Sequence, residues 1–183
     1  MKLKSLLLLI FWPAIFSAQT TAKVNLLTAL FAVPQVGIET KLGVKTTFQL
    51  DLEAAYWKSF SGGPQQFLIV IPEFRYYPKA AFEGFFIGGH IGGSVYRMQK
   101  WNYINTDLYQ QGYSYLIGAT IGYQFKINEN FSSEMFLGGG NQQGFYKGYS
   151  ISTGIRYDGA ENYNKSGEFI PYRIGMMLVY KLK

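Results

Sequence analysis

The sequence predicts an all-β protein: an eight-stranded antiparallel up-and-down transmembrane β-barrel preceded by a cleavable signal peptide. Three observations support this fold class. The chain contains 15 Tyr, 15 Phe, 3 Trp and 21 Gly, while charged residues make up only 15% of it. Apolar residues recur at every second position in several segments, which is the period of a β-strand. The chain also begins with an export-type segment, and exported chains rich in aromatic residues and glycine are typical of outer-membrane barrels.

Residues 1–18 have the three parts of a secretory signal peptide. Lys2 and Lys4 give a positive start, residues 6–16 form a short apolar core, and Ser17-Ala18 supplies the small residues of a cleavage site. A membrane-spanning helix needs about 20 apolar residues, so an uncleaved anchor is the less favoured interpretation. Residues 19–183 are then expected to form the barrel, as one domain in the cell outer membrane.

The composition argues against several kinds of site. No cysteine is present, which excludes a disulfide framework and a lipid-modified cysteine. The formal charge is +6, but the basic residues are scattered, whereas a nucleic-acid site would cluster them. One histidine and no cysteine make a metal site or a cofactor unexpected. Asp158, Glu161 and Asn162 are the nearest approach to a calcium loop, but their spacing differs from that of an EF-hand, and a solvated turn is expected.

Residues 113–127 show the alternation most clearly. Every odd-numbered position is apolar or aromatic, whereas the even-numbered positions include Ser114, Gln124 and Lys126. This pattern predicts a strand with one face towards lipid and the other towards the barrel interior. The C-terminal segment behaves likewise and is expected to point Tyr172 to lipid and Arg173 inwards, because a charge facing lipid costs about 2–4 kcal/mol at the membrane midplane.

The same reasoning gives eight strands, an even number as single-chain outer-membrane barrels require. The expected strands are residues 24–31, 36–42, 48–57, 67–77, 85–97, 113–127, 131–140 and 171–183. The connections after the first strand alternate between short and long, and short turns belong on the periplasmic side. The expected short ones are 43–47, 78–84 and 128–130, and the expected long ones are 57–66, 98–111 and 141–169, with a further short turn at Pro34.

The segment FFIGGHIGGSVYR, residues 85–97, surrounds the only histidine of the chain with glycines. A nucleotide-binding glycine loop would need a strand before it and a helix after it, and neither pattern is present. As a strand, the segment points Phe85, Ile87 and Ile91 to lipid and His90 to the interior. The glycines then relieve crowding where a narrow barrel is filled with side chains.

The barrel interior is expected to hold a network of charged groups, because buried charges must be paired and hydrogen-bonded. His90 is the one weak candidate for a catalytic base. Positions i and i+4 of a strand lie about 13 Å apart, so His90 could not activate Ser94 directly, and another serine from a neighbouring strand would be needed. The expected members of the network are Glu39, Lys41, Asp51, Glu53, Glu73, Arg75, His90, Glu134 and Arg173.

Basic residues lie in or beside the expected long loops, at the level where lipopolysaccharide phosphates would be. They are Lys58, Arg97, Lys100, Lys147, Arg156 and Lys165. Two interpretations are open: the side chains pair with phosphate, or they are solvated loop charges. The expected partners are outer-membrane lipid with its lipopolysaccharide and the outer-membrane assembly machinery, and the protein is expected to be a monomer that binds no nucleic acid.

Three segments carry a family resemblance: VNLLTALFAVPQVGIETKLG at 24–43, IPEFRYYP at 71–78, and FEGFFIGGHIGG at 82–93. Together they resemble an uncharacterised family of small outer-membrane β-barrel proteins common in Bacteroidetes-type bacteria, which is filed as a domain of unknown function. The resemblance extends from there to the C-terminus. It implies an eight-stranded outer-membrane barrel with no established activity, and it supplies no catalytic residues.

The C-terminal strand is similar to the signal that the outer-membrane assembly machinery reads. Arg173, Gly175, Leu178 and Tyr180 give its polar, glycine, hydrophobic and aromatic positions. The chain departs from that signal by ending on Lys183 rather than on an aromatic residue.

Three functions are consistent with these expectations. The first is a structural or interaction role without catalysis, in which a rigid barrel with a polar, side-chain-filled lumen displays loops. The second is a lipid A-modifying enzyme, which would need a histidine and a serine close together near the membrane interface. The third is a carrier or pore for a small ligand, although eight strands leave little aqueous path.

Overall fold

The computed structural model describes residues 19–60, 62–159 and 162–182. The predicted signal peptide, residues 1–18, lies outside the described residues. The strands are β1 (Thr20–Asn25), β2 (Gln35–Lys41), β3 (Thr46–Lys58), β4 (Pro64–Tyr76), β5 (Gly84–Met98), β6 (Leu108–Lys126), β7 (Phe131–Ser150) and β8 (Asn164–Lys181). Two helical turns, α2 (Leu26–Ala29) and η1 (Trp101–Tyr103), lie in the connections.

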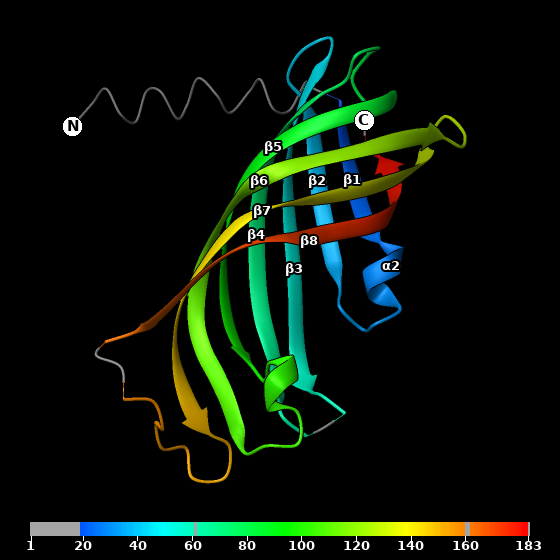
Figure 1. Cartoon of the computed structure of the whole chain (residues 1–183). Coiled ribbons are helices and arrows are strands. Elements are labelled where there is room, and N and C mark those ends of the chain that lie inside the picture. The colour runs from blue at the N-terminus through cyan, green and yellow to red at the C-terminus, as the bar shows by residue number, and fades with distance from the viewer. Residues whose placement is uncertain (1–18, 61, 160–161, 183) are drawn as a thin grey trace, which may run out of the picture.

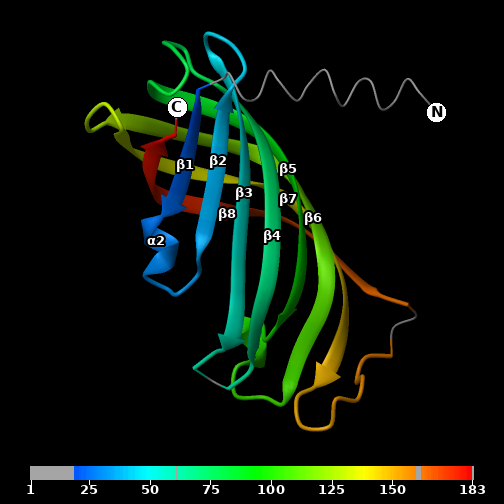
Figure 2. The same ribbon diagram turned by 180° about the vertical axis from the view of Figure 1, so that it is seen from behind.

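Each strand pairs antiparallel with the next, and β1 also pairs with β8, so the sheet closes on itself (Figures 1 and 2). The prediction of an all-β chain with eight antiparallel strands in sequential order is therefore confirmed. Within the described ranges, no helix is long and apolar enough to cross a membrane.

The two ends of the barrel differ. The start of β1, the end of β8 and the connections 42–45, 77–83 and 127–130 lie at one end, called here the terminal end (Figure 1). The connections 26–34 and 99–107 and the described parts of 59–63 and 151–163 lie at the opposite end, the loop end. Because β1 and β2 are short, β3 to β8 continue past α2 towards the loop end as a curved sheet (Figures 1 and 2).

Side chains alternate between the outside and the inside of the barrel. On β5, the side chains of Phe85, Ile87 and Ile91 are about half exposed, whereas those of Phe86 and His90 are buried. The predicted faces of residues 85–97 and of 113–127 are therefore confirmed. The resulting surface is unusual: the outward residues are mostly apolar, and most of the buried ones are polar or charged.

The prediction of a first strand at residues 24–31 is wrong. β1 begins at Thr20 and ends at Asn25, where the chain turns into α2. The side chain of Asn25 accepts hydrogen bonds from the backbone N–H groups of Leu27 and Thr28, at 3.0 and 3.4 Å, and so caps the helical turn. Asn25 Oδ1 also accepts a hydrogen bond from Met176 N of β8, so this buried residue both ends β1 and holds it to its neighbour.

Replacing Asn25 by alanine is expected to lower the free energy of unfolding by about 1–2 kcal/mol. The change removes the cap of α2 and leaves the backbone N–H groups of Leu27, Thr28 and Met176 without this acceptor. Urea unfolding of the refolded protein, followed by tyrosine and tryptophan fluorescence, measures the change. Thr28→Ala, whose hydroxyl makes only a 3.5 Å bond to Asn25 O, is the matched control and should stay within about 0.5 kcal/mol of the wild type.

The expected ends of the last strands are also wrong. β7 continues to Ser150 rather than stopping at residue 140, and β8 begins at Asn164, so the expected loop 141–169 shrinks to 151–163. The sequence Asn141-Gln142-Gln143 is polar at consecutive positions and hides the period of two. Pairing with β6 nevertheless continues without a break as far as Leu108 and Ser150, because the ladder is held by backbone groups.

Candidate functional site

The middle of the barrel holds a network of ion pairs without solvent exposure, and its first part surrounds Arg75. Arg75 Nη1 lies 3.0 Å from both carboxylate oxygens of Glu134 and 3.4 Å from Glu39 Oε2. Lys23 forms ion pairs with both Glu39 and Glu134. Tyr77 donates its hydroxyl to Glu39 Oε1 at 2.9 Å. Each charge is therefore met by at least one opposite charge, as burial requires.

The second part of the network surrounds Arg173. Its Nη1 donates to Glu73 Oε2 at 2.5 Å, and its Nη2 donates to Asp51 Oδ2. Arg75 Nη2 lies 3.3 Å from the same Glu73 oxygen, so Glu73 joins the two parts. Gln49 Nε2 donates to both oxygens of Asp51, at 2.7 and 2.8 Å.

All eight strands contribute polar side chains to this interior. Arg173 Nη1 donates to Thr120 Oγ1 at 3.2 Å, and the same hydroxyl lies 3.1 Å from His90 Nδ1. The interior network thus joins opposite walls of the barrel through side chains as well as through the sheet. Its members, from β1 to β8, are Lys23, Glu39, Asp51, Glu73 with Arg75, His90, Thr120, Glu134 and Arg173.

Most of the residues expected in the interior are brought together, with three differences. Lys41 at the terminal end and Glu53 towards the loop end are only half-buried. Among the described residues, neither forms an ion pair with the network. Lys23 is not among the expected members, because the predicted first strand begins only at residue 24, whereas β1 begins at Thr20. Its signal was present, since Thr21, Lys23 and Asn25 alternate as polar residues along β1.

His90 lies inside the barrel between two hydroxyl groups. Its Nε2 is 2.7 Å from Tyr172 OH, and the Tyr172 ring stands edge-on to the imidazole with centroids 5.5 Å apart. Its Nδ1 faces Thr120, as described above. Ser94 instead makes a hydrogen bond of 2.7 Å with Ser114. The hydroxyls that His90 contacts are thus those of a tyrosine and a threonine, and the serine that a lipid-modifying enzyme would need is not one of them.

The prediction that Tyr172 faces lipid is wrong, because β8 contains a β-bulge. Gly138 of β7 pairs with Arg173, while Gly139 pairs with Pro171, which leaves Tyr172 as the extra residue. Two consecutive side chains, Tyr172 and Arg173, therefore point into the barrel. Proline next to the bulge is consistent with this, since it cannot donate to the ladder.

The rest of the interior differs between the two ends. Tyr77, Phe86, Phe136, Met177 and Val179 pack as an apolar cluster on the terminal side of the network. Arg75 also lies over the Phe86 ring, 4.2 Å from its centroid, so the cluster and the network are in contact. Towards the loop end there is a cavity of about 280 Å³ whose lining includes residues of β4, β5, β7 and β8.

The residues of the expected assembly signal all lie on β8. Arg173 and Gly175 are buried in the interior, whereas Leu178 and Tyr180 are exposed on the outer face. The strand closes the barrel by pairing with both β7 and β1. This places the four residues on the strand that completes the ring.

Two loop-end connections are fastened by an exposed carboxylate. Asp107 accepts hydrogen bonds from Ser150 Oγ at 2.5 Å, and from Ser152 Oγ and N at 2.7 and 2.9 Å. These hydrogen bonds lower the pKa of Asp107 and keep its carboxylate ionised, and the bond from Ser150 has the largest effect. Asp158 lies in the next part of this loop and forms an ion pair with Arg156 at 2.5 Å, whereas Glu161 lies outside the described residues. In the described part of the chain no group of three or more potential metal ligands occurs.

Comparison with known proteins places the chain in a family without giving it an activity. A search of curated proteins finds no match. Residues 4–182, nearly the whole chain, match one family model. The expected resemblance to an uncharacterised domain family is thereby confirmed at the level of the family. The chain belongs to the family described as "Protein of unknown function (DUF3575)".

Proposed function

We propose that this protein is an outer-membrane β-barrel with a structural or interaction role and no catalytic one. The observation that carries the proposal is that the polarity of the barrel's outer and inner faces is the reverse of that in a water-soluble barrel. Apolar side chains cover the outside, and a charged network fills the middle of the inside. A water-soluble carrier barrel would need the opposite arrangement.

Every strand contributes exposed apolar side chains to the outer face. Soluble monomers rarely expose a contiguous apolar patch of more than a few hundred Å². Here isoleucine, leucine, valine and phenylalanine side chains of all eight strands are exposed, which suits contact with lipid tails. Examples from different strands are Ile38, Leu50, Leu68, Ile91, Ile117, Leu137 and Ile174.

Aromatic side chains border this apolar face, as the girdles of outer-membrane barrels do. At the terminal end, Tyr123 packs on Phe125 with ring centroids 4.6 Å apart, and Phe131 packs on Tyr180 at 5.0 Å. At the loop end, Tyr113 stacks on Phe145 at 5.3 Å. The terminal end would face the periplasm and the loop end the cell exterior, since short turns belong to the periplasmic side.

The same proposal covers export, assembly and the lipid environment. A signal peptide at residues 1–18 would send the chain across the inner membrane. The outer-membrane assembly machinery would read β8 through Arg173, Gly175, Leu178 and Tyr180. The folded monomer would then contact outer-membrane lipid and lipopolysaccharide.

The test is the gel mobility of the protein from the outer-membrane fraction, compared before and after heating in detergent. A folded transmembrane barrel resists the detergent, so we expect a band that migrates differently until the sample is boiled. Periplasmic and inner-membrane fractions of the same cells are the controls. A protein found in the soluble periplasm, with one mobility at both temperatures, would contradict the proposal and would direct attention to the interior cavity as a ligand site.

A further inference from the structure

A row of polar side chains crosses the outer face near the loop end. The strand register places five residues directly opposite one another, on β3, β4, β5, β6 and β7. In that order they are Tyr56, Gln66, Arg97, Gln111 and Lys147. All five point outwards, so they form one line across the surface.

The polar row borders the apolar face. Two residues closer to the terminal end, the next outward row consists of Ala54, Leu68, Val95, Tyr113 and Phe145. At about 3.3 Å per residue, the change from apolar to polar takes place within about 7 Å. In a bilayer this is the level of the lipid headgroups.

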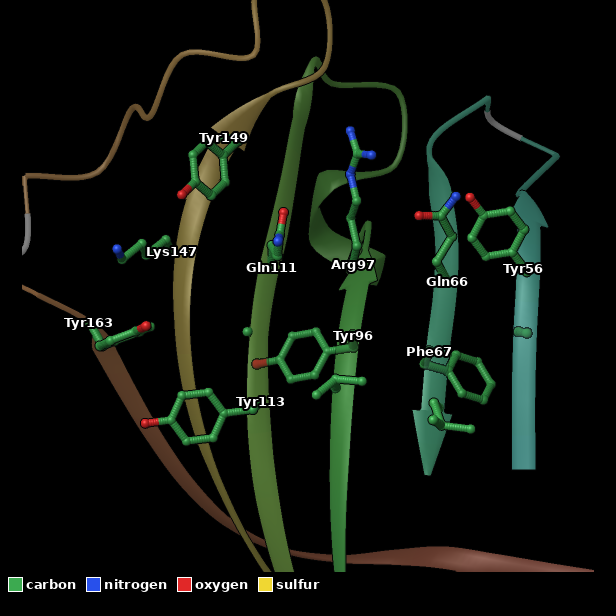
Figure 3. A pocket seen from close by; sticks show the side chains of 14 residues that line it. Tyr56, Gln66, Phe67, Tyr96, Arg97, Gln111, Tyr113, Lys147, Tyr149 and Tyr163 are labelled. Atoms are coloured by element: carbon green, nitrogen blue, oxygen red, sulfur yellow. The ribbon is translucent and has the colours of Figure 1, made fainter. Parts of the chain in front are cut away.

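The polar row lies in a groove of about 600 Å³ (Figure 3). Figure 3 shows Gln111 between Arg97 and Lys147, with Tyr149 and Tyr163 on either side of Lys147. No aspartate or glutamate lines the groove within the part of the chain that the structure describes. Its two charges are therefore both positive.

Among the described residues, aromatic rings rather than carboxylates lie against the two cations. Arg97 lies over the ring of Tyr109, 4.7 Å from its centroid, and donates from Nη2 to the tyrosine hydroxyl at 3.3 Å. Lys147 Nζ lies 4.8 Å from the centroid of Tyr163. An aromatic ring leaves most hydrogen-bond donors of a cation available to an anion, whereas a carboxylate partner would neutralise the charge.

We propose that this groove binds the phosphorylated headgroup of a lipid in the outer leaflet, an inference that rests on the proposed membrane location. Arg97 and Lys147 would hold the phosphate, and Gln111 would donate a neutral hydrogen bond between them. The two basic residues are two strands apart, about 10 Å, a gap that two long side chains can close around one phosphate.

The structure separates these two residues from the other four basic residues expected near the loops. Lys100 lies over Tyr146 and lines the interior cavity. Arg156 forms its ion pair with Asp158. Lys58 and Lys165 are exposed on β3 and β8 but do not line the groove.

The test compares wild type with Arg97→Gln/Lys147→Gln, both folded in neutral detergent. Three probes are titrated at fixed ionic strength and followed by native mass spectrometry: diphosphorylated lipid A, the same lipid with its phosphates removed, and inorganic phosphate alone. The matched control is Lys45→Gln/Lys126→Gln, which removes the same charge from exposed positions at the terminal end. Each variant is first checked for the heat-dependent mobility shift.

We expect the double variant to bind diphosphorylated lipid A about 10-fold or more weakly than wild type, and the control to stay within about 2-fold. The dephosphorylated lipid should bind wild type and double variant alike, and weakly. Equal affinity of the double variant and the wild type for the phosphorylated lipid would overturn the groove as the binding site. Equal affinity of the wild type for the phosphorylated and the dephosphorylated lipid would overturn the phosphate as the recognised group. Binding of inorganic phosphate as tight as that of the lipid would overturn the lipid as the ligand. A wild type without the mobility shift would instead overturn the proposed function itself.

Discussion

Replacing Arg75 by methionine is expected to lower the free energy of unfolding by about 3–5 kcal/mol. Arg75 makes ion pairs with three carboxylates, those of Glu39, Glu73 and Glu134, and its side chain is fully buried. Methionine fills much of the same volume, but the loss of the charge leaves these carboxylates with fewer partners in a medium that solvates them poorly. Urea unfolding in detergent, with the heat-shifted gel band as a second readout, measures the loss.

Two further variants separate the charge from the packing. Arg156→Met removes an arginine from a partly exposed pair with Asp158, and its effect should stay below about 1 kcal/mol. Arg75→Met/Glu134→Gln restores the original excess of one carboxylate over the cations of the network, and it should therefore recover at least about 1 kcal/mol of the loss. Wild-type stability of the Arg75 variant, or no recovery in the double variant, would show that the network is not what holds the interior together.

The barrel could be predicted from the sequence because its outward-facing residues produce a regular apolar pattern along each strand. Lipid contact requires apolar residues at every second position, so residues 85–97 and 113–127 could be assigned to strands with the correct faces. The interior members Glu39, Glu73, Arg75 and Arg173 followed from the same parity. The alternation of apolar residues can be recognised within a single strand, whereas the pairing of strands cannot.

Features that depend on neighbouring strands were missed. The bulge that turns Tyr172 inwards results from the pairing of β8 with β7, and two consecutive inward residues contradict any strict alternation. Asn25 looks like an ordinary strand residue until its side chain is seen capping α2. The polar residues at 141–143 carry no period, and only the ladder with β6 shows that they belong to β7. The groove at Arg97 and Lys147 likewise can be recognised only from the register of five strands.

The adjacent glycines Gly88 and Gly89 offer the sharpest test of that register. A Cβ at Gly88 would meet Glu73 Oε1 inside the barrel, and would lie 2.8 Å from Glu73 Cδ. Glu73 cannot simply move aside, because Arg75 and Arg173 both hold it. Gly88→Ala is therefore expected to lower the free energy of unfolding by about 2–3 kcal/mol, measured by urea unfolding in detergent.

Gly89→Ala serves as the matched control, since the same methyl group is added one residue away. A Cβ at Gly89 would have no heavy atom within 4 Å, because it points outwards. This variant should be as stable as wild type or gain up to about 1 kcal/mol, because alanine restricts the unfolded chain. A shift of one residue in register would exchange the two results, since it moves every side chain to the other face. Such an exchange would place His90 on the lipid face, where a membrane-exposed histidine would make a lipid-modifying activity the better interpretation.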